Sequence, residues 1–359
     1  MIRKIIVANI ILTLASLTGC LLCINAYLLY ASNHNNQSDG FSRRLLQYFD
    51  PIARWGYPDI GTKRNSDKRT TFIVGDSYAE GAGDGFLSNA YDYSVGHFIH
   101  KKEAISLDLA MAANSGSDIP KQLDMLNLKL QGQLEPLSFR INNNSSINLL
   151  LFFYEGNDLE NVTRSKRKLS DSNFEVVTRK YFPILYAAQK LWRERSESTN
   201  DQAQTITISN RICVRSSCRD VPPLQSASVG MTRSQITNAI GYTISEIKAF
   251  RQKHPRGESC FVYVPSPATI YSPNKFYFQN YFGNSAVSST STINSANSQF
   301  IRSEIQEKLT KDGVKFVDPT RRFQDLGRLG YVHGYRDPNH FSIEGYRTLA
   351  HIVASECKL

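Results

Sequence analysis

The chain has 359 residues, of which 41% are apolar and 21% are charged, and its formal net charge is +10 at pH 7. This composition is that of a folded globular chain and excludes disorder over most of the length. The basic residues are scattered, without zinc-finger spacing, an RNA-binding aromatic motif or a basic heptad pattern, so we expect no nucleic-acid partner. The charge indicates a solvated face, or attraction to an anionic membrane or polysaccharide.

Residues 5–30 form an apolar run without charged residues, and Arg3 and Lys4 precede it. As a helix this run is about 39 Å long, enough to cross a hydrocarbon core of about 30 Å with some tilt. Its length exceeds that of a cleaved signal peptide. The basic residues place its N-terminus in the cytoplasm and the rest of the chain outside, in a bacterial periplasm. The run therefore predicts a single-pass membrane anchor.

An alternative interpretation of the same run is a lipid anchor. Leu17-Thr18-Gly19-Cys20 resembles a bacterial lipoprotein cleavage box with Cys20 as the lipidated residue. The apolar run continues past Cys20 to Tyr30, where lipoproteins usually turn polar, so its length favours the spanning helix. Both interpretations leave the domain that follows tethered outside the cytoplasm.

Residues 31–69 are polar and irregular, and they predict a stalk between the anchor at 1–30 and a domain at 70–359. In that domain, apolar runs bounded by turn residues predict five buried parallel strands at Thr71–Gly75, Ile105–Ala110, Ile147–Tyr154, Cys260–Val264 and Val314–Val317. Helical patterns lie at about 88–102, 118–131, 232–253, 296–311 and 342–356. This alternation predicts a three-layer α/β/α sandwich around a five-stranded parallel sheet.

Two connections in this domain are longer than usual, and we expect both to be insertions. Residues 159–231 include a helical pattern at 174–195 and the basic cluster near 164–168, and we expect them to shape a substrate site. Residues 268–295 are rich in Ser, Asn and Tyr, and we expect a mobile rim loop there.

Four cysteines lie in the predicted domain, where an oxidising compartment favours disulfides over free thiols. Cys213 and Cys218 are close enough in sequence to close a small loop. Cys260 opens a predicted strand, and Cys357 ends a helix that runs back toward the same edge of the sheet. A Cys260–Cys357 bridge is therefore feasible, although four free buried thiols are the alternative.

Residues that can carry chemistry cluster where the predicted strands end, at the edge where open α/β sheets bind ligands. The first block is Gly75-Asp76-Ser77 after the first strand, and the second is Asn114-Ser115-Gly116 after the second. The third is Glu155-Gly156-Asn157-Asp158 after the third strand, and the fourth is Asp337-Pro338-Asn339-His340 before the last helix. A serine hydroxyl needs a base, and a histidine oriented by a carboxylate three residues away can supply one.

Together, the four blocks resemble the SGNH (GDSL-like) hydrolase superfamily over residues 70–359, apart from the insertions. The resemblance implies a flavodoxin-like sheet, Ser77 as nucleophile, His340 as base and Asp337 as the residue that orients His340. It also implies an oxyanion hole formed by the N–H of Ser77, the N–H of Gly116 and the side chain of Asn157. No metal or other cofactor is implied.

Three positions set limits on this resemblance. The α/β-hydrolase elbow G-x-S-x-G is a rival, but Ala79 occupies its last position, and that fold takes its acid and base from different loops. Glu155 replaces the small residue that the superfamily usually has, and we expect it to modify the site's charge or loop conformation. Asp76 is the second candidate modulator of the nucleophile.

The expected function is that of a serine esterase that removes an acyl group, expected to be acetate, from an envelope or extracellular carbohydrate. One alternative is an O-acyltransferase that passes the acetyl group to a polysaccharide hydroxyl, because the same triad forms the same acyl-enzyme. Another is an inactive glycan-binding or assembly protein on the same fold. The expected partners are an acylated carbohydrate or other small ester, and the membrane through residues 5–30.

Overall fold

The structure is a computed structural model that describes residues 16, 18–24, 70–87, 93–103, 108–113, 115–131, 146–165, 209–280 and 285–357. A five-stranded parallel sheet forms its centre, with strand order β10-β7-β4-β2-β3. The strands are β2 (Thr70–Gly75), β3 (Asp108–Ala113), β4 (Ile147–Tyr154), β7 (Ser259–Val264) and β10 (Lys315–Val317). The first strand thus lies between the second and third, as in flavodoxin-like folds. The predicted sheet is confirmed.

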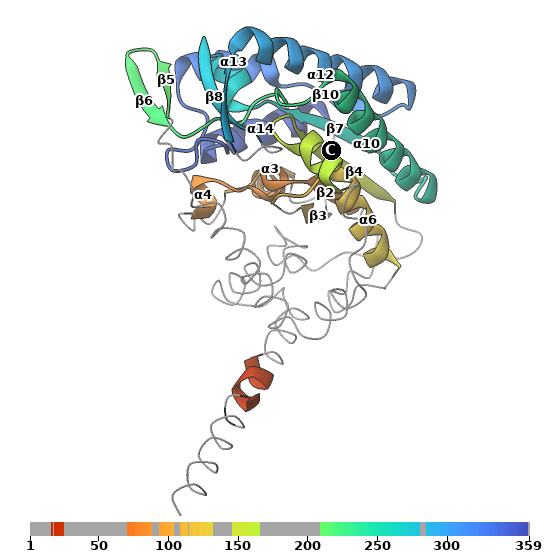
Figure 1. The fold of residues 1–359 in the computed structure, drawn as a ribbon. Coiled ribbons are helices and arrows are strands. Elements are labelled where there is room, and N and C mark those ends of the chain that lie inside the picture. The colour runs from red at the N-terminus through yellow and green to blue at the C-terminus, as the bar shows by residue number, and fades with distance from the viewer. Residues whose placement is uncertain are drawn as a thin grey trace, which may run out of the picture. The chain divides into compact units, whose positions relative to one another are not determined.

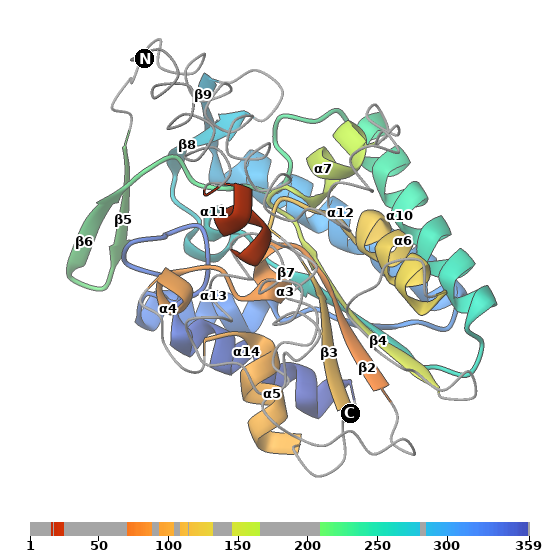
Figure 2. The same ribbon diagram turned by 90° about the horizontal axis from the view of Figure 1, so that it is seen from below.

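Helices cover both faces of this sheet. One side carries α5 (Val95–Glu103), α13 (Thr320–Leu329) and α14 (Ile343–Glu356) (Figure 2). The opposite side carries α6 (Ile119–Leu130), α10 (Arg233–Lys253) and α12 (Ser291–Lys311). The described helices and the sheet therefore make the three layers that the alternation of patterns predicts.

Burial explains why these segments form the sheet. In β4, every residue except Asn148 is buried, as a central parallel strand with helices on both faces requires. One face packs with α5, α13 and α14 into an apolar cluster that includes Ile73, Met111, Leu150, Phe152, Val95, Phe323 and Leu349. The longest helices begin at side-chain caps, such as the capping box of Thr232 and Gln235 at the start of α10.

The second strand ends three residues later than predicted, and residues 105–107 of the prediction lie outside the described residues. The interpretation placed it at 105–110, but β3 covers Asp108–Ala113. Thr70 pairs with Asp108 and Gly75 with Ala113, so all of β3 lies beside β2 and both strands end at the same edge. The run of small apolar residues from Ala110 to Ala113 belongs to the strand and is buried.

For residues 268–280 and 285–295, the expectation of a loop is wrong. This segment contains α11 (Pro267–Tyr271), the antiparallel hairpin of β8 (Lys275–Asn280) and β9 (Ser285–Thr290), and the first turn of α12 (Figure 1). A second hairpin, β5 (Asn210–Val214) and β6 (Ser217–Val221), comes from the other insertion. The two share an apolar cluster that includes Ile212, Val221, Leu224, Phe276 and Phe278. This buried cluster is the physical reason that the described part of the segment forms regular structure.

Both disulfides are present. Cys213 and Cys218 face each other across the β5–β6 hairpin and are bonded. Cys260, at the start of β7, is bonded to Cys357, directly after α14, with a Cα–Cα distance of 5.8 Å. The bridge joins the end of the last helix to the edge of the sheet opposite the strand ends that carry the first three sequence blocks.

Most of the predicted anchor and all of the predicted stalk lie outside the described residues, as does the helical pattern at 174–195. Within 5–30, only residue 16 and residues 18–24 are described; they are helical, and Cys20 and Cys23 are exposed thiols. In the part of the chain that the structure describes, no helix has the length and hydropathy needed to cross a membrane.

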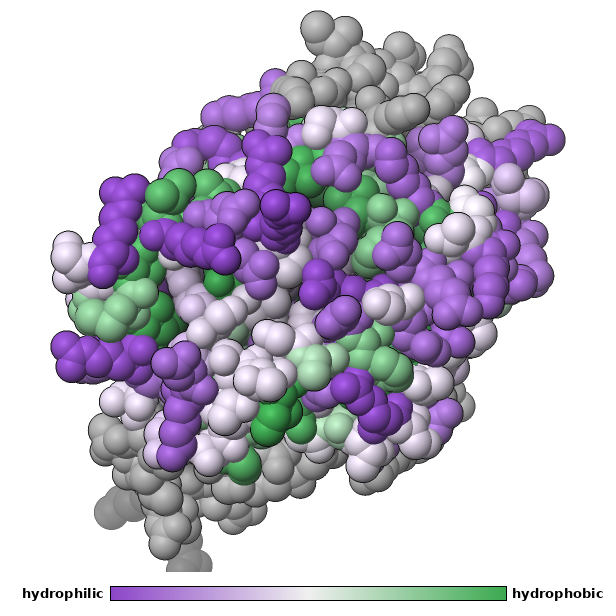
Figure 3. All heavy atoms as spheres, turned by 90° about the horizontal axis from the view of Figure 1, so that it is seen from above, coloured by the Kyte–Doolittle hydropathy of each residue, from purple (hydrophilic) through white to green (hydrophobic). Residues whose placement is uncertain are grey.

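The face of the molecule drawn in Figure 3 is mostly hydrophilic, with hydrophobic residues in small separate groups.

Candidate active site

The turn that carries Ser77 follows β2 directly. Ser77 is the first residue of the short helix α3 (Ser77–Glu80), and its side chain is buried under loops at the carboxyl edge of the sheet. Gly75 is required at the end of β2, because a Cβ there would lie 2.7 Å from the carbonyl oxygen of Phe152 in the neighbouring strand. The close approach of β2 and β4 thus fixes where the Ser77 hydroxyl emerges.

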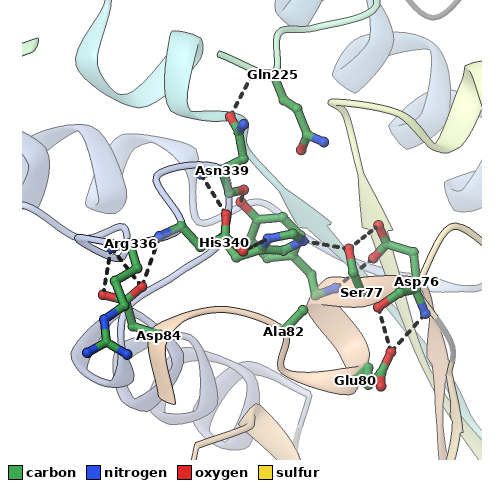
Figure 4. Close-up of polar contacts among 12 residues, drawn as sticks. Asp76, Ser77, Glu80, Ala82, Asp84, Gln225, Arg336, Asn339 and His340 are labelled. Atoms are coloured by element: carbon green, nitrogen blue, oxygen red, sulfur yellow. Dashed lines mark hydrogen bonds and ion pairs between the residues drawn. The ribbon is translucent and has the colours of Figure 1, made fainter. Parts of the chain in front are cut away.

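A chain of two hydrogen bonds joins three of the predicted site residues (Figure 4). The Oγ of Ser77 lies 2.8 Å from Nε2 of His340, and Nδ1 of His340 lies 2.6 Å from Oδ2 of Asp337. Burial raises the pKa of Asp337, but the hydrogen bond and charge of His340 outweigh burial and hold that pKa below its ordinary value. Asp337 is therefore ionised and accepts from Nδ1–H, which leaves Nε2 as the acceptor for the Ser77 proton.

Several contacts hold the His340 loop against the nucleophile turn. The hydroxyl of Tyr78 donates to the carbonyl of Asn339, and its ring centroid lies 5.2 Å from that of His340. The side chain of Asn339 accepts from the N–H of Gln225 at 2.8 Å, which ties the loop to the segment that follows β6. Ser342 caps α14 by accepting from the N–H of Gly345, so the predicted start of the last helix is confirmed. His340 is therefore held from both sides.

Asp76 offers the Ser77 hydroxyl a second acceptor. Its Oδ2 lies 3.2 Å from Oγ of Ser77, and its Oδ1 accepts from the N–H of Tyr78 at 2.9 Å. Burial raises the pKa of Asp76 to about 6, against the lowering effects of the Tyr78 N–H and of His340. Burial and the charge of Asp76 also raise the pKa of Asp158 well above its ordinary value. The shorter contact makes His340 the preferred acceptor of the serine proton.

The raised pKa of Asp76 predicts a pH-dependent loss of stability. A group with a higher pKa in the folded state stabilises the fold below its unfolded pKa, and that contribution disappears as the pH rises through the folded pKa. As the pH rises from about 4 to about 6, the free energy of unfolding of the wild type should fall by up to about 3 kcal/mol more than that of Asp76→Asn. The figure follows from the rise of the pKa from 3.8 to about 6, because one pKa unit corresponds to about 1.36 kcal/mol. Denaturant unfolding of both proteins across this range measures the difference. An equal pH dependence in the two proteins contradicts the prediction.

The two other predicted oxyanion donors follow the strands on either side of β2. Gly116 lies after β3 with a left-handed φ of 72°, and Asn157 lies after β4 with a buried side chain. Glu80, on the helix that carries Ser77, accepts from both N and Oγ of Ser115 at 2.8 and 2.7 Å, so α3 anchors the Gly116 loop. No hydrogen bond between the described residues joins Gly116 or Asn157 to Ser77, His340 or Asp337. Sheet order places both loops beside the nucleophile.

Glu155 connects elements and does not contact the Ser77–His340–Asp337 chain through any hydrogen bond of the described residues. Its Oε1 accepts from N and Oγ of Ser266, each at 2.7 Å. Its Oε2 accepts from Oγ of Ser298 at 2.7 Å and from the hydroxyl of Tyr263. Of the two expected effects of this residue, the structure therefore supports the one on loop conformation, because the carboxylate ties the Asn157 loop to β7, α11 and α12.

Removing this carboxylate should destabilise the protein. In Glu155→Ala, the N–H of Ser266 and three hydroxyls lose their shared buried acceptor, and we expect a loss of about 3–5 kcal/mol in unfolding free energy. Glu155→Gln is the matched control, because its oxygen can still accept from Ser266 while the hydroxyls of Tyr263 and Ser298 turn to accept from its amide. We expect that variant to lose less than half as much. Denaturant unfolding measures both, and equal losses contradict the arrangement.

Sequence reasoning missed two acidic residues near the nucleophile. Glu80 holds the Gly116 loop, and the carboxylate of Asp84 accepts backbone N–H groups from the segment that leads into Asp337. Both lie within a few residues of Ser77 in the segment Ala79-Glu80-Gly81-Ala82-Gly83-Asp84-Gly85. Acidic residues between closely spaced glycines were the available signal, since such glycines indicate close backbone approach.

Comparison with known proteins finds no matching family model and no similar curated protein. Among solved structures, the chain is similar to an extracellular lipase from Streptomyces rimosus, with 14% identity, 80% of this chain and 99% of that chain covered, and a TM-score of 0.40. It is similar to phospholipase A1 from Streptomyces albidoflavus with 16% identity, 80% and 99% coverage and a TM-score of 0.38. A catalytic mutant of an acetylxylan esterase from Geobacillus stearothermophilus matches with 10% identity, 82% and 96% coverage and a TM-score of 0.36.

Proposed function

We propose that the chain is a serine ester hydrolase of the SGNH type that acts through an acyl-enzyme on Ser77. One observation carries the proposal: the unbroken hydrogen-bond chain from Ser77 Oγ through His340 to Asp337, at distances of 2.8 and 2.6 Å. A nucleophile, a base within reach and a third group that orients the base are the recognisable parts of covalent acyl transfer.

In the proposed first half-reaction, Ser77 Oγ attacks the ester carbonyl carbon while its proton passes to Nε2 of His340. Asp337 stabilises the imidazolium that forms. The negative oxygen of the tetrahedral intermediate accepts from the N–H of Ser77, the N–H of Gly116 and the amide of Asn157. The intermediate then expels the alcohol, which takes the proton from His340. Water, activated by the same histidine, attacks the acyl-enzyme and releases the carboxylic acid and free Ser77.

The proposed substrate is an acylated, in particular acetylated, carbohydrate of the cell envelope. The proposed location, a tethered domain outside the cytoplasm, rests on the apolar run at 5–30 after Arg3 and Lys4. The Cys213–Cys218 and Cys260–Cys357 bridges support it, because disulfides persist in oxidising compartments. An O-acetylated polysaccharide is an ester that an enzyme in this place would meet.

The test combines covalent labelling with substrate turnover. A fluorophosphonate probe should label the wild-type protein on the peptide that contains Ser77, as mass spectrometry would show, and short-chain aryl esters should be hydrolysed. An acetylated polysaccharide should then release acetate. Absence of both labelling and hydrolysis rejects the proposal. Transfer of acetyl groups to added glycan acceptors faster than acetate release selects the acyltransferase instead.

A further inference from the structure

The side chain of Asp84 accepts hydrogen bonds from three consecutive backbone N–H groups. Asp84 opens the short helix α4 (Asp84–Leu87), a few residues after the nucleophile. Its carboxylate accepts from N of Tyr335 at 2.5 Å, from N of Arg336 at 3.0 Å and from N of Asp337 at 2.9 Å. Figure 4 shows this carboxylate directed at the backbone beside Arg336, on the same loop as His340. The nucleophile segment thus holds the segment that carries the acid of the triad.

The fit between the two segments depends on the absence of two side chains. At Gly334, a Cβ would lie 2.6 Å from Oδ1 of Asp84, so any other residue there would displace the carboxylate. At Gly83, where φ is 132°, a Cβ would lie 2.8 Å from the carbonyl oxygen of Phe341 and 3.2 Å from Cβ of His340. Both glycines allow backbone to approach backbone. The carboxylate therefore occupies a shaped concavity of N–H donors, of the kind that binds anions.

Other contacts between the same segments fix the ends of this loop. The hydroxyl of Tyr346 donates to the carbonyl of Ala82 at 2.6 Å, and the N–H of Gly334 donates to the carbonyl of His340 at 2.9 Å. These bonds close the loop at His340 and fasten α14 to the nucleophile segment. Of the contacts described, those from Asp84 alone reach the backbone of Asp337 from the nucleophile segment.

We propose that Asp84 is a positioning residue that sets the orientation of Asp337, and through it the tautomer and direction of His340. The inference rests on the proposed function, because it assigns Asp84 a part in that same reaction. The N–H of Asp337 is one of the three donors, so the Asp84 carboxylate fixes the backbone from which the Asp337 side chain reaches Nδ1 of His340. All three partners are donors, so both carboxylate oxygens must accept, and an amide cannot replace them without placing a donor against a donor.

The kinetic test uses the full chain with Asp84→Ala. We expect kcat for an aryl ester to fall by about 10- to 100-fold, because displacement of a catalytic group by about 1 Å can cost that much, while KM stays within about twofold. Asp84 is only partly buried, so added formate should enter the vacated concavity, accept from the three N–H groups and restore part of kcat. Asp84→Asn fills the space without supplying the second acceptor, and we expect a lowered kcat that formate does not restore. Unchanged kcat in both variants overturns the proposal.

The matched control is Asp318→Ala. Asp318 also accepts from a backbone N–H, that of Thr320 at 3.0 Å, and pairs with Arg302 away from the triad. This variant should lose stability without losing kcat and without responding to formate. If Asp318→Ala lowers kcat as much as Asp84→Ala does, or if formate raises both equally, Asp84 has only a general structural role.

A spectroscopic measurement separates this inference from the proposed function. The proton on Nδ1 of His340, which is hydrogen-bonded to the carboxylate of Asp337, should give a far-downfield NMR resonance. The resonance is assigned to this proton if it is absent from the spectrum of Asp337→Asn. We expect the resonance in the wild type, its loss or broadening in Asp84→Ala, and its return with formate. If the wild type hydrolyses no ester but the resonance behaves in this way, the proposed function fails and the positioning role stands. If the resonance is unchanged in Asp84→Ala, the positioning role fails.

Discussion

Replacement of Ser77 by alanine should lower kcat for a short-chain aryl ester by about 10⁶-fold, the loss typical of removing the nucleophile from a triad. In the proposed mechanism, the Ser77 hydroxyl forms the covalent bond to the acyl group. Neither His340 nor Asp337 can replace it, because His340 only accepts and returns the serine proton and Asp337 only stabilises the imidazolium. Binding and the oxyanion donors remain, so a residual rate above that of water is expected. Initial rates measured with a preparation in which contaminating esterase activity is negligible would give the loss in kcat.

The control for this variant is Ser245→Ala. Ser245 lies on the exposed face of α10, where its hydroxyl donates to the carbonyl of Tyr242, and it should leave kcat and KM unchanged. Ser77→Ala should also lose fluorophosphonate labelling while it keeps the wild-type unfolding free energy to within about 1 kcal/mol. A Ser77→Ala protein that keeps more than a small fraction of the activity removes Ser77 from the role of nucleophile.

The second large effect is expected for Asp337→Asn, with a loss in kcat of about 10⁴-fold and little change in KM. The ionised carboxylate accepts from Nδ1–H of His340 at 2.6 Å and so keeps Nε2 free for the Ser77 proton. An asparagine amide can instead donate to Nδ1, which moves the histidine proton to Nε2 and points it at Ser77. The loss arises from the wrong tautomer, so the fold and substrate binding should survive.

The matched control for this charge removal is Asp325→Asn. Asp325 lies on α13 in an exposed ion pair with Arg328, and such a pair contributes little to stability or activity.

The free energy of unfolding that Asp337→Asn loses should depend on pH in the opposite direction to the free energy that Asp76→Asn loses. The pKa of Asp337 is lowered in the folded state, so its contribution is present at neutral pH and is lost as the pH falls through that lowered pKa. A full rate in Asp337→Asn would mean that His340 is oriented by another group.

The sheet and the meeting of Ser77, His340 and Asp337 were predictable because each leaves a local signal at a boundary. Ser77, Gly116 and Asn157 follow apolar runs that can only be buried strands, and His340 precedes a helix with Ser342 as its cap. Parallel strands bring these boundaries to one edge, whatever the length of chain between them. The same topology made a Cys260–Cys357 bridge feasible, since a helix that starts at one edge of a sheet ends near the other, and the bond is present.

The remaining features depend on contacts between distant segments, which periodicity does not report. The end of β3 is set by its pairing with β2 as far as Gly75 and Ala113, which the apolar run at 105–110 does not show. The 268–295 segment contains few runs of apolar residues, yet Phe276 and Phe278 are buried against the β5–β6 hairpin. Asp84 and Glu155 accept from backbone and hydroxyl groups whose positions exist only in the folded chain. A carboxylate's hydrogen-bond partners cannot be read from its neighbours in sequence.

The distance along the chain between nucleophile and base has a consequence for when activity can first arise. Ser77 and His340 touch but are separated by 263 residues, and the intervening chain supplies four of the five strands of the central sheet. Contacts of such long sequence separation form late, because closing the loop costs entropy before it is repaid by packing. A chain still under synthesis can hold a completed nucleophile turn and no base at all. The proposed active site therefore comes into being only with the docking of α14, and the Cys260–Cys357 bond then keeps that helix in place.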